Sequence, residues 1–321
     1  MRNNKFLIIS FFLLCLVFIF LSCKRNQKVS NNETVRDKIW LWGHVEGSHN
    51  GHFGLPSGLD GSKITMMEAC NYMGIKNCMV VEYDGKPEYE EGANYAAQLS
   101  DCKRIGWSAV GAGTPDDFVV DHVKPIKTIL QLSDKFENLK EVMFDDFFVG
   151  DKPRVTLDQL HEMRTLIHER ERPLDMWVVI YDFNLEEYLH DEYLEYFDVL
   201  NFWTWKSNDL DSLEANLNKL RLRAPNKRIM LGCYMYDYGL NKPMSVRKMA
   251  EQCQNALKFL KDGSIEGIVF LASCICDLNL DAVEWTREWV TYVGDNNIQE
   301  IDLREINSWT ELSIQKYTNI D

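Results

Sequence analysis

The sequence has little of what marks several large classes of protein. Its body contains no run of basic residues, and 49 acidic against 35 basic residues give the 321-residue chain a net charge of −14. Such a chain is poorly suited to holding a phosphate backbone, so nucleic acid is excluded as its main partner. The chain also lacks a Gly-rich phosphate turn, a Ser nucleophile elbow and a Lys suited to a Schiff base at a strand end. Their absence argues against kinase, esterase and aldolase functions.

The nine cysteines form no recognisable framework. Cys274-Ile-Cys276 lacks the spacing of a zinc knuckle or a redox pair. Cys78 and Cys233 lie in apolar runs, where a thiol behaves as a small hydrophobic group. We therefore expect no disulfide framework and no metal site from the cysteines, and the sequence indicates no cofactor.

The N-terminal segment has the pattern of an export signal. Two basic residues precede an apolar run over residues 6–21, which has secretory-signal length and is short for a transmembrane helix. The run ends in Phe-Leu-Ser-Cys at Cys23, which resembles the lipobox of bacterial lipoproteins. That resemblance implies removal of residues 1–22, a lipid on Cys23 and anchoring to the bacterial cell envelope. Because Lys24 rather than Asp follows the cysteine, we expect the outer membrane; an uncleaved anchor is the alternative, and the membrane face stays open.

The rest of the chain predicts one closed barrel. Residues 23–37 are polar without an apolar period and are expected to form a tether. In the body, residues 38–296, short apolar runs alternate with segments of helical period, and continuous apolarity is typical of strands buried on both faces of a parallel sheet. The strand candidates are residues 39–44, 78–83, 105–111, 141–147, 176–182, 199–205, 229–236 and 268–273.

Eight strand–helix units in about 260 residues predict an α/β fold, a single (β/α)8 barrel. An open doubly wound sheet would show a Gly-rich turn after its first strand, and this chain does not. Residues 297–321 are expected to pack on the outer face of the barrel.

Acidic residues gather where the predicted strands end, which is the end at which such barrels carry their active sites. Asp145 and Asp146 close the fourth strand between phenylalanines, and burying adjacent carboxylates without a task or a partner is costly. Because neighbouring side chains on a strand alternate, we expect one of them to enter the barrel mouth. Apolar walls and like charge would raise one pKa, as a general acid requires. The alternative is that both only cap the following loop.

Three further acidic residues end other predicted strands. Asp237 follows the seventh strand, across the mouth from the fourth, and either faces the acid pair or forms a salt bridge to a basic loop residue. Glu82 and Asp182 are expected either to bind substrate hydroxyls or to pin loops, and Asn201 is expected to bind hydroxyls.

Aromatic residues share this rim, and their flat faces suit the C–H faces of pyranose rings. We expect Trp42, Trp203, Trp205 and Tyr236 to stack on a substrate, with filling of the barrel core as the alternative.

A Gly/Ser/Asn-rich loop after the first strand contains His44, His49 and His52. Their spacing matches neither the His-x-His of metallohydrolase barrels nor a His-Glu-x-x-His helix. Substrate contact, chiefly by His44, a metal site and a plain surface loop all remain open.

Taken together, the lipobox, the eight units, the aromatic rim and the Val-Met-Phe-Asp-Asp-Phe-Phe segment of strand four resemble the glycoside hydrolase (β/α)8 superfamily. The resemblance implies hydrolysis of an oligosaccharide or polysaccharide, with Asp146, or else Asp145, as general acid and Asp237 as nucleophile or base. Chitinase-type barrels carry Asp-x-x-Asp-x-Asp-x-Glu on strand four and a tryptophan closing strand eight; this chain carries neither.

Two other functions are compatible with the sequence. One is a glycan-binding lipoprotein that keeps the barrel but not the chemistry. The other is a metal-dependent phosphodiesterase that would use a histidine of the first loop with Asp145.

Overall fold

The computed structural model describes residues 33–111, 121–148 and 153–318. The chain divides into two units, Met1–Glu33 and Thr34–Asp321. The predicted signal peptide, Cys23 and most of the predicted tether lie outside the described residues. Among the residues that are described, no helix has the length and apolarity needed to cross a bilayer.

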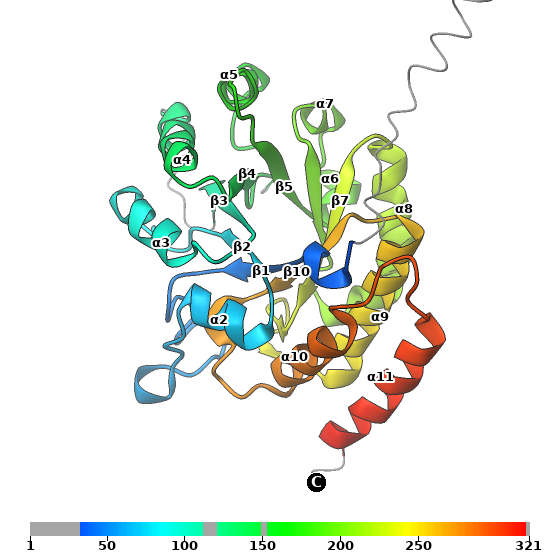
Figure 1. Ribbon diagram of the computed structural model, residues 1–321. Coiled ribbons are helices and arrows are strands. Elements are labelled where there is room, and N and C mark those ends of the chain that lie inside the picture. The colour runs from blue at the N-terminus through cyan, green and yellow to red at the C-terminus, as the bar shows by residue number, and fades with distance from the viewer. Residues whose placement is uncertain (1–32, 112–120, 149–152, 319–321) are drawn as a thin grey trace, which may run out of the picture. The chain divides into compact units, whose positions relative to one another are not determined.

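Eight parallel strands close into a barrel in the second unit (Figure 1). They are β1 (Ile39–Gly43), β2 (Asn77–Val80), β3 (Arg104–Val110), β4 (Leu139–Phe144), β5 (Asp175–Tyr181), β6 (Val199–Trp203), β7 (Arg228–Tyr234) and β10 (Gly267–Leu271). Each pairs with its neighbour in sequence order, and β10 closes the ring on β1. The predicted (β/α)8 barrel is confirmed. A short antiparallel pair, β8 (Tyr236–Asp237) and β9 (Lys242–Pro243), follows β7.

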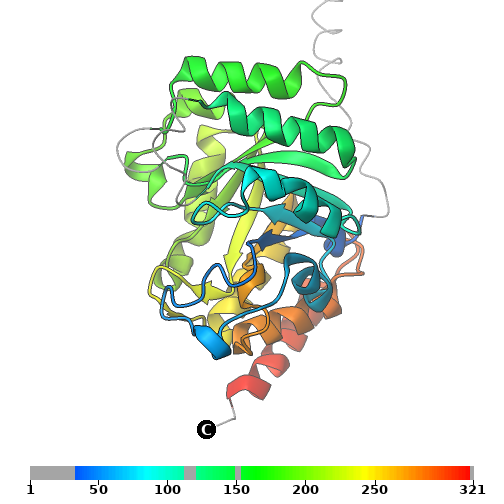
Figure 2. The same ribbon diagram turned by 90° about the vertical axis from the view of Figure 1, so that its left-hand side faces the viewer.

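Helices surround the barrel, and Figure 2 shows α4 and α5 lying side by side along its outside. The helices are α2 (Met66–Met73), α3 (Gly92–Gln98), α4 (Val123–Lys135), α5 (Leu157–His168), α6 (Asn184–Glu187), α7 (Asp191–Leu194), α8 (Leu213–Arg223), α9 (Val246–Asp262), α10 (Asp281–Val293) and α11 (Leu303–Thr318). Local sequence fixes several ends. Thr65 and Glu68 form a capping box at the start of α2, and Gly74 ends it with a left-handed backbone.

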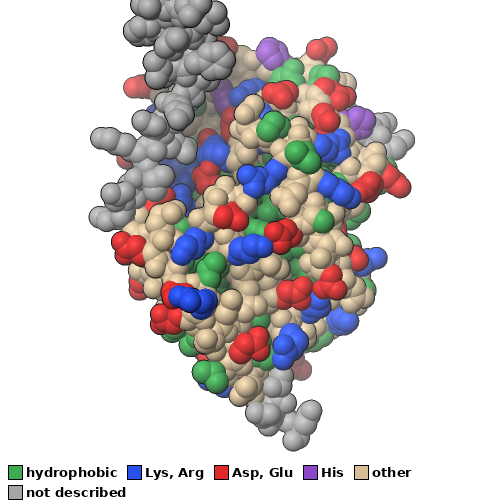
Figure 3. All heavy atoms as spheres, turned by 90° about the vertical axis from the view of Figure 1, so that its right-hand side faces the viewer, with side chains coloured by type: hydrophobic (Ala, Val, Ile, Leu, Met, Phe, Trp, Pro, Cys, Tyr) green, Lys and Arg blue, Asp and Glu red, His purple; other side chains and the backbone are tan. Residues whose placement is uncertain are grey.

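The C-terminal helix α11 packs on α9 and α10. Trp285 Nε1 donates to Ser313 Oγ at 2.8 Å, and the Trp309 ring stacks on Tyr292 with centroids 4.6 Å apart. The surface on this side, seen in Figure 3, carries interspersed acidic and basic side chains. One such pair joins Lys258 of α9 to Glu214 of α8 at 2.9 Å.

Tryptophan rings fill the barrel interior below its carboxyl end. The Trp203 ring lies against the backbone of β7, since a Cβ added at Gly232 would come within 2.0 Å of it. Trp42 meets Trp203 edge-on with centroids 5.4 Å apart, and Trp40 meets Trp177 in the same way at 5.1 Å. These rigid contacts support the side chains at the rim.

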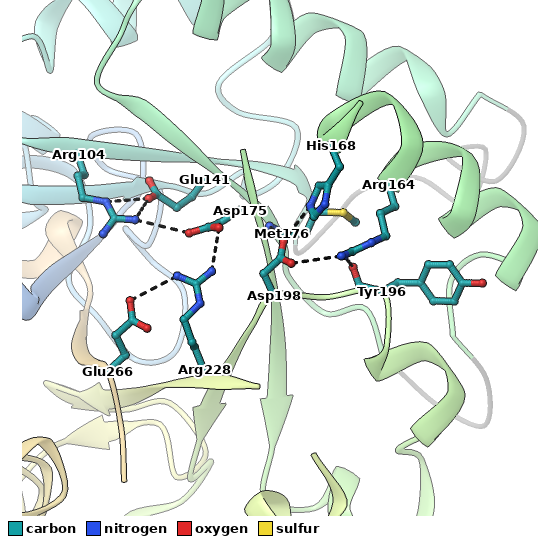
Figure 4. A network of polar contacts seen from close by, with 10 residues as sticks. All are labelled: Arg104, Glu141, Arg164, His168, Asp175, Met176, Tyr196, Asp198, Arg228 and Glu266. Carbon is teal, nitrogen blue, oxygen red and sulfur yellow. Dashed lines mark hydrogen bonds and ion pairs between the residues drawn. The ribbon is translucent and has the colours of Figure 1, made fainter. Parts of the chain in front are cut away.

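An ionic layer occupies the other end of the barrel, where the strands begin (Figure 4). Arg104 Nε donates to Glu141 Oε1 at 2.8 Å, and Asp175 lies between Arg104 (3.8 Å) and Arg228 (2.8 Å). Arg228 also reaches Glu266, at 3.5 Å. Glu141 is fully buried, and its burial raises its pKa to about 8 although the Arg104 charge opposes the shift.

Asp198 extends this polar network beside β5 and β6 (Figure 4). Its Oδ2 accepts from His168 Nε2 at 2.9 Å and from the backbone N–H of Met176 at 2.8 Å, and Arg164 lies 3.4 Å from Oδ1. These charged groups therefore form ion pairs and hydrogen bonds with one another inside the fold. The carboxyl end of the barrel, in contrast, holds an open site.

Candidate functional site

A cavity of about 460 Å³ lies at the carboxyl ends of the barrel strands. In the described part of the chain, its walls include three carboxylates: Asp84, Asp145 and Asp146. Aromatic rings make up most of the remaining wall. They are Trp42, Phe53, Tyr83, Tyr181, Trp203, Trp205, Tyr234 and Tyr238, together with the imidazoles of His44, His49 and His52. Acids beside flat rings, as expected from the sequence, thus share one cavity.

The acid pair sits in the turn that follows β4. The strand ends at Phe144, although Asp145 N–H still donates to Val110 O of β3 at 3.0 Å. Asp146 has a left-handed backbone, with φ 49°. The expectation that only one carboxylate would enter the barrel mouth is wrong: strand alternation stops before the pair, and both residues line the cavity.

Burial controls the electrostatics of this pair. It raises the pKa of Asp145 well above the usual range, and the Asp146 charge adds to that shift. The pKa of Asp146 is also raised by burial, against the lowering effects of the Tyr181 hydroxyl and of Arg154. Because the two carboxyls are adjacent and desolvated, they retain a proton at a pH where a solvated aspartate would have lost it.

Hydrogen bonds fix the orientation of both carboxyls. Asp146 N–H donates to Asp145 Oδ1 at 2.9 Å, and the Tyr181 hydroxyl donates to Asp146 Oδ1 at 2.9 Å. Arg154 Nε donates to the backbone oxygen of Asp146 at 2.8 Å, which holds the turn. The Tyr181 hydroxyl donates to Oδ1 of the Asp146 carboxyl and not to Oδ2.

Asp237 lies outside the cavity. It is fully buried, and its carboxylate accepts the backbone N–H groups of Ser207 at 3.3 Å and Leu240 at 3.1 Å. The strand expected to carry it ends at Tyr234, and Asp237 belongs to the short β8 that follows. In the structure this carboxylate holds two loops together and is not part of the cavity lining.

Four expected substrate-binding residues also lie away from the lining. Asp182 Oδ1 accepts the N–H groups of Phe183 at 3.0 Å and Trp205 at 3.2 Å, so it fixes the backbone of an aromatic residue that does line the cavity. The Tyr236 hydroxyl donates to Phe53 O at 2.8 Å and so holds the loop after β1.

Asn201 is fully buried, two residues before Trp203 on β6 and therefore on the same face, deeper in the barrel. Neither atom of its amide has a hydrogen-bond partner among the described residues. Glu82 follows β2, where its backbone N–H donates to Ser108 Oγ at 2.8 Å, and it is not part of the lining either.

The structure places four of the expected substrate-binding residues in the wall: Trp42, His44, Trp203 and Trp205. Trp203 is only 1% exposed, so its ring fills the core as much as it lines the site. Asp84 and Tyr234, to which no role was assigned from the sequence, also line the cavity. Tyr234 could have been found as an aromatic residue near the end of the seventh apolar run, whereas Asp84 enters the wall through a left-handed turn (φ 51°) before Gly85.

The histidines form part of the cavity wall. His44 Nδ1 lies 3.0 Å from Val81 O, and His49 Nδ1 lies 2.9 Å from the Tyr238 hydroxyl. Burial lowers the pKa of His44 to about 4 and that of His49 to about 2, so both rings are neutral at pH 7. Across the described ranges, no group of three or more His, Cys, Asp or Glu side chains is arranged to hold a metal ion.

Comparisons with known proteins identify the fold. No protein-family model and no curated protein sequence matches the chain. The catalytic domain of a hyperthermophilic chitinase from Pyrococcus furiosus superposes with a TM-score of 0.50 and 11% identity, over 75% of this chain and 86% of that one.

Active domain 2 of the chitinase from the same organism was solved as catalytic-site mutants, in one case complexed with chito-oligosaccharides. These structures give TM-scores of 0.50 and 0.51 at 10% identity, over 91% of this chain and 99% of theirs. At such identities the likeness concerns architecture alone. The chain shares the (β/α)8 barrel fold of these chitinase domains.

Proposed function

We propose that this protein is a glycoside hydrolase that cleaves an oligosaccharide or polysaccharide in the cavity at the carboxyl end of the barrel. The observation that carries the proposal is the Asp145–Asp146 pair, whose pKa values are raised, set among tryptophan and tyrosine rings in one cavity. Raised carboxyl pKa values suit proton donation to a leaving oxygen near neutral pH. Flat rings suit the stacking of a sugar.

Asp146 is the general acid in this proposal. It is more exposed than Asp145, which is only 6% exposed. With Oδ1 held by the Tyr181 hydroxyl, Oδ2 carries the proton that passes to the glycosidic oxygen. Asp84 reaches the cavity from the end of β2 and is the lining carboxylate outside the pair, so we assign it the activation of the attacking water.

The test is an assay of the purified protein on a panel of chito-oligosaccharides, other β- and α-linked oligosaccharides and 4-nitrophenyl glycosides. Chito-oligosaccharides enter the panel because a structurally similar chitinase domain was solved with them. We expect release of reducing ends or nitrophenol, with activity falling as the pH rises through the raised pKa of the acid pair. The absence of product from every glycan would contradict hydrolysis.

A non-catalytic glycan-binding protein is the second candidate. Asp237, the carboxylate expected opposite the acid pair, is occupied by backbone N–H groups, and this observation favours binding without cleavage. Calorimetric binding of a panel glycan without product after prolonged incubation would support this candidate over the first.

We also propose that the chain is anchored through a lipid on Cys23 to the bacterial cell envelope, in the outer membrane. The support is the Phe-Leu-Ser-Cys ending of the apolar N-terminal run. Cys23→Ser is expected to abolish incorporation of labelled fatty acid and to shift the protein from the membrane to the soluble fraction of expressing cells. Cys78→Ser, which changes a cysteine of the barrel, is the control and should stay labelled. Equal labelling of the Cys23→Ser protein would contradict the anchor.

A further inference from the structure

His44 has its backbone and one ring nitrogen fixed by the barrel. Its N–H donates to Ser273 Oγ at 3.0 Å, and Ser273 Oγ donates back to His44 O at 3.2 Å. Its ring nitrogen Nδ1 lies 3.0 Å from the carbonyl oxygen of Val81. The residue is only 4% exposed and lines the cavity. Its position in the site is therefore set by the fold and not by a ligand.

These contacts determine where the imidazole proton sits. A carbonyl oxygen only accepts hydrogen bonds, so Nδ1 must carry the hydrogen that it shares with Val81 O. Burial keeps the ring neutral at pH 7, and a neutral imidazole has one N–H. Nε2 is therefore unprotonated, with a lone pair to offer. No hydrogen bond to Nε2 is found among the described residues.

Aromatic rings surround the imidazole of His44. The His49 ring lies 4.8 Å away and the Tyr83 ring 5.6 Å away, both in the cavity wall. His49 is itself neutral and is held by the hydroxyl of Tyr238. A lone pair in such surroundings attracts a hydrogen-bond donor and repels a carboxylate or phosphate.

We propose that His44 Nε2 is the acceptor that recognises a hydroxyl group of the ligand, and that it makes this wall of the cavity selective for an uncharged polyhydroxylated ring. The identity of the ligand as a neutral sugar rests on the proposed function, whereas the tautomer of His44 does not. A ligand that lacks this hydroxyl would leave a buried acceptor unpaired, and such losses weigh heavily in discrimination.

The tautomer is tested first, on the protein without substrate. Protein labelled with ¹⁵N-histidine is examined by long-range ¹H–¹⁵N correlation at pH 7, and the His44→Gln spectrum assigns the signal. We expect His44 to be neutral with its proton on Nδ1. A proton on Nε2, or a doubly protonated ring, would overturn the proposal whether or not the protein hydrolyses any glycan.

Recognition is tested with the 4-nitrophenyl glycoside that the panel identifies as substrate and with its monodeoxy analogues. His44→Phe is expected to lower kcat/KM for the parent glycoside about 10- to 100-fold. For one monodeoxy analogue, wild type and His44→Phe should differ by less than about twofold, because the acceptor then has nothing to bind. His44→Gln, whose amide oxygen can still accept, should keep kcat/KM within about tenfold of wild type.

The matched control is His161→Gln, which changes a histidine of α5 whose ring contacts Tyr196 outside the cavity. It should leave kcat/KM and the melting temperature unchanged. If His44→Phe lowers kcat/KM equally for the parent and for every monodeoxy analogue, His44 has only a structural role and the recognition proposal fails. If no glycoside is hydrolysed, calorimetry with the glycan that binds best provides the same comparison through Kd.

Discussion

Replacing Asp146 by Asn is expected to lower turnover of the best glycan substrate by about 10²- to 10⁴-fold, the range that loss of a general acid produces. Asn has the same size and keeps an oxygen that can accept the hydrogen bond from the Tyr181 hydroxyl, so the turn after β4 should persist. It removes the proton that the leaving oxygen needs. The measurement is kcat and kcat/KM on that substrate, with thermal unfolding in parallel, and the melting temperature should change little.

The matched control is Asp237→Asn. Asp237 is an aspartate beyond the seventh barrel strand, but its carboxylate binds the N–H groups of Ser207 and Leu240 and lies outside the cavity. We expect this variant to lose stability while the turnover of the folded fraction is kept. Full activity of Asp146→Asn on a cleaved glycan would remove Asp146 from the mechanism. Loss of turnover in a fully stable Asp237→Asn protein would mean that Asp237 takes part in the mechanism.

The contrast between these aspartates shows what a strand pattern can predict. The barrel strands are continuous apolar runs because both of their faces are buried, and that signal is strong enough to locate every strand of the barrel. Asp145 and Asp146 come directly after such a run, so their place at the barrel mouth follows from the end of the strand. The left-handed backbone of Asp146, which brings both carboxyls into the cavity, has no comparable sequence signal.

Asp237 and Asn201 show where such reasoning fails. The apolar run of the seventh strand continues to Tyr236, but the barrel strand ends at Tyr234. Asp237 belongs instead to β8, which pairs with β9 in a separate short antiparallel ladder. Asn201 points into the barrel, as alternation predicts, but it lies deeper than Trp203, and depth depends on the stagger of the strands. Within a strand, the direction of a side chain can be predicted from sequence more reliably than its distance from the mouth of the barrel.

At the opposite end of the barrel, Arg104→Met is expected to destabilise the protein in a strongly pH-dependent way. Burial raises the pKa of the fully buried Glu141 from its usual value of 4.5 to about 8, so the folded state holds a proton there that the unfolded state releases. Wild-type stability should therefore fall as the pH rises from about 4.5 and level off above 8, when Glu141 ionises beside Arg104. Without Arg104, Glu141 stays protonated to higher pH and the fall continues.

Below pH 8, where Glu141 is largely neutral in both proteins, Arg104→Met removes a hydrogen bond and the partly exposed ion pair with Asp175, together about 1 kcal/mol. Above pH 8 the difference should widen by about 1.4 kcal/mol per pH unit, to about 3 kcal/mol at pH 9.5. Urea unfolding at pH 6 and pH 9.5 measures both values. In a Glu141→Gln background, where nothing can ionise, the Arg104→Met difference should be the same at the two pH values. An equal loss at pH 6 and pH 9.5 in the wild-type background would mean that Glu141 is ionised throughout, and that Arg104 balances a permanently buried charge.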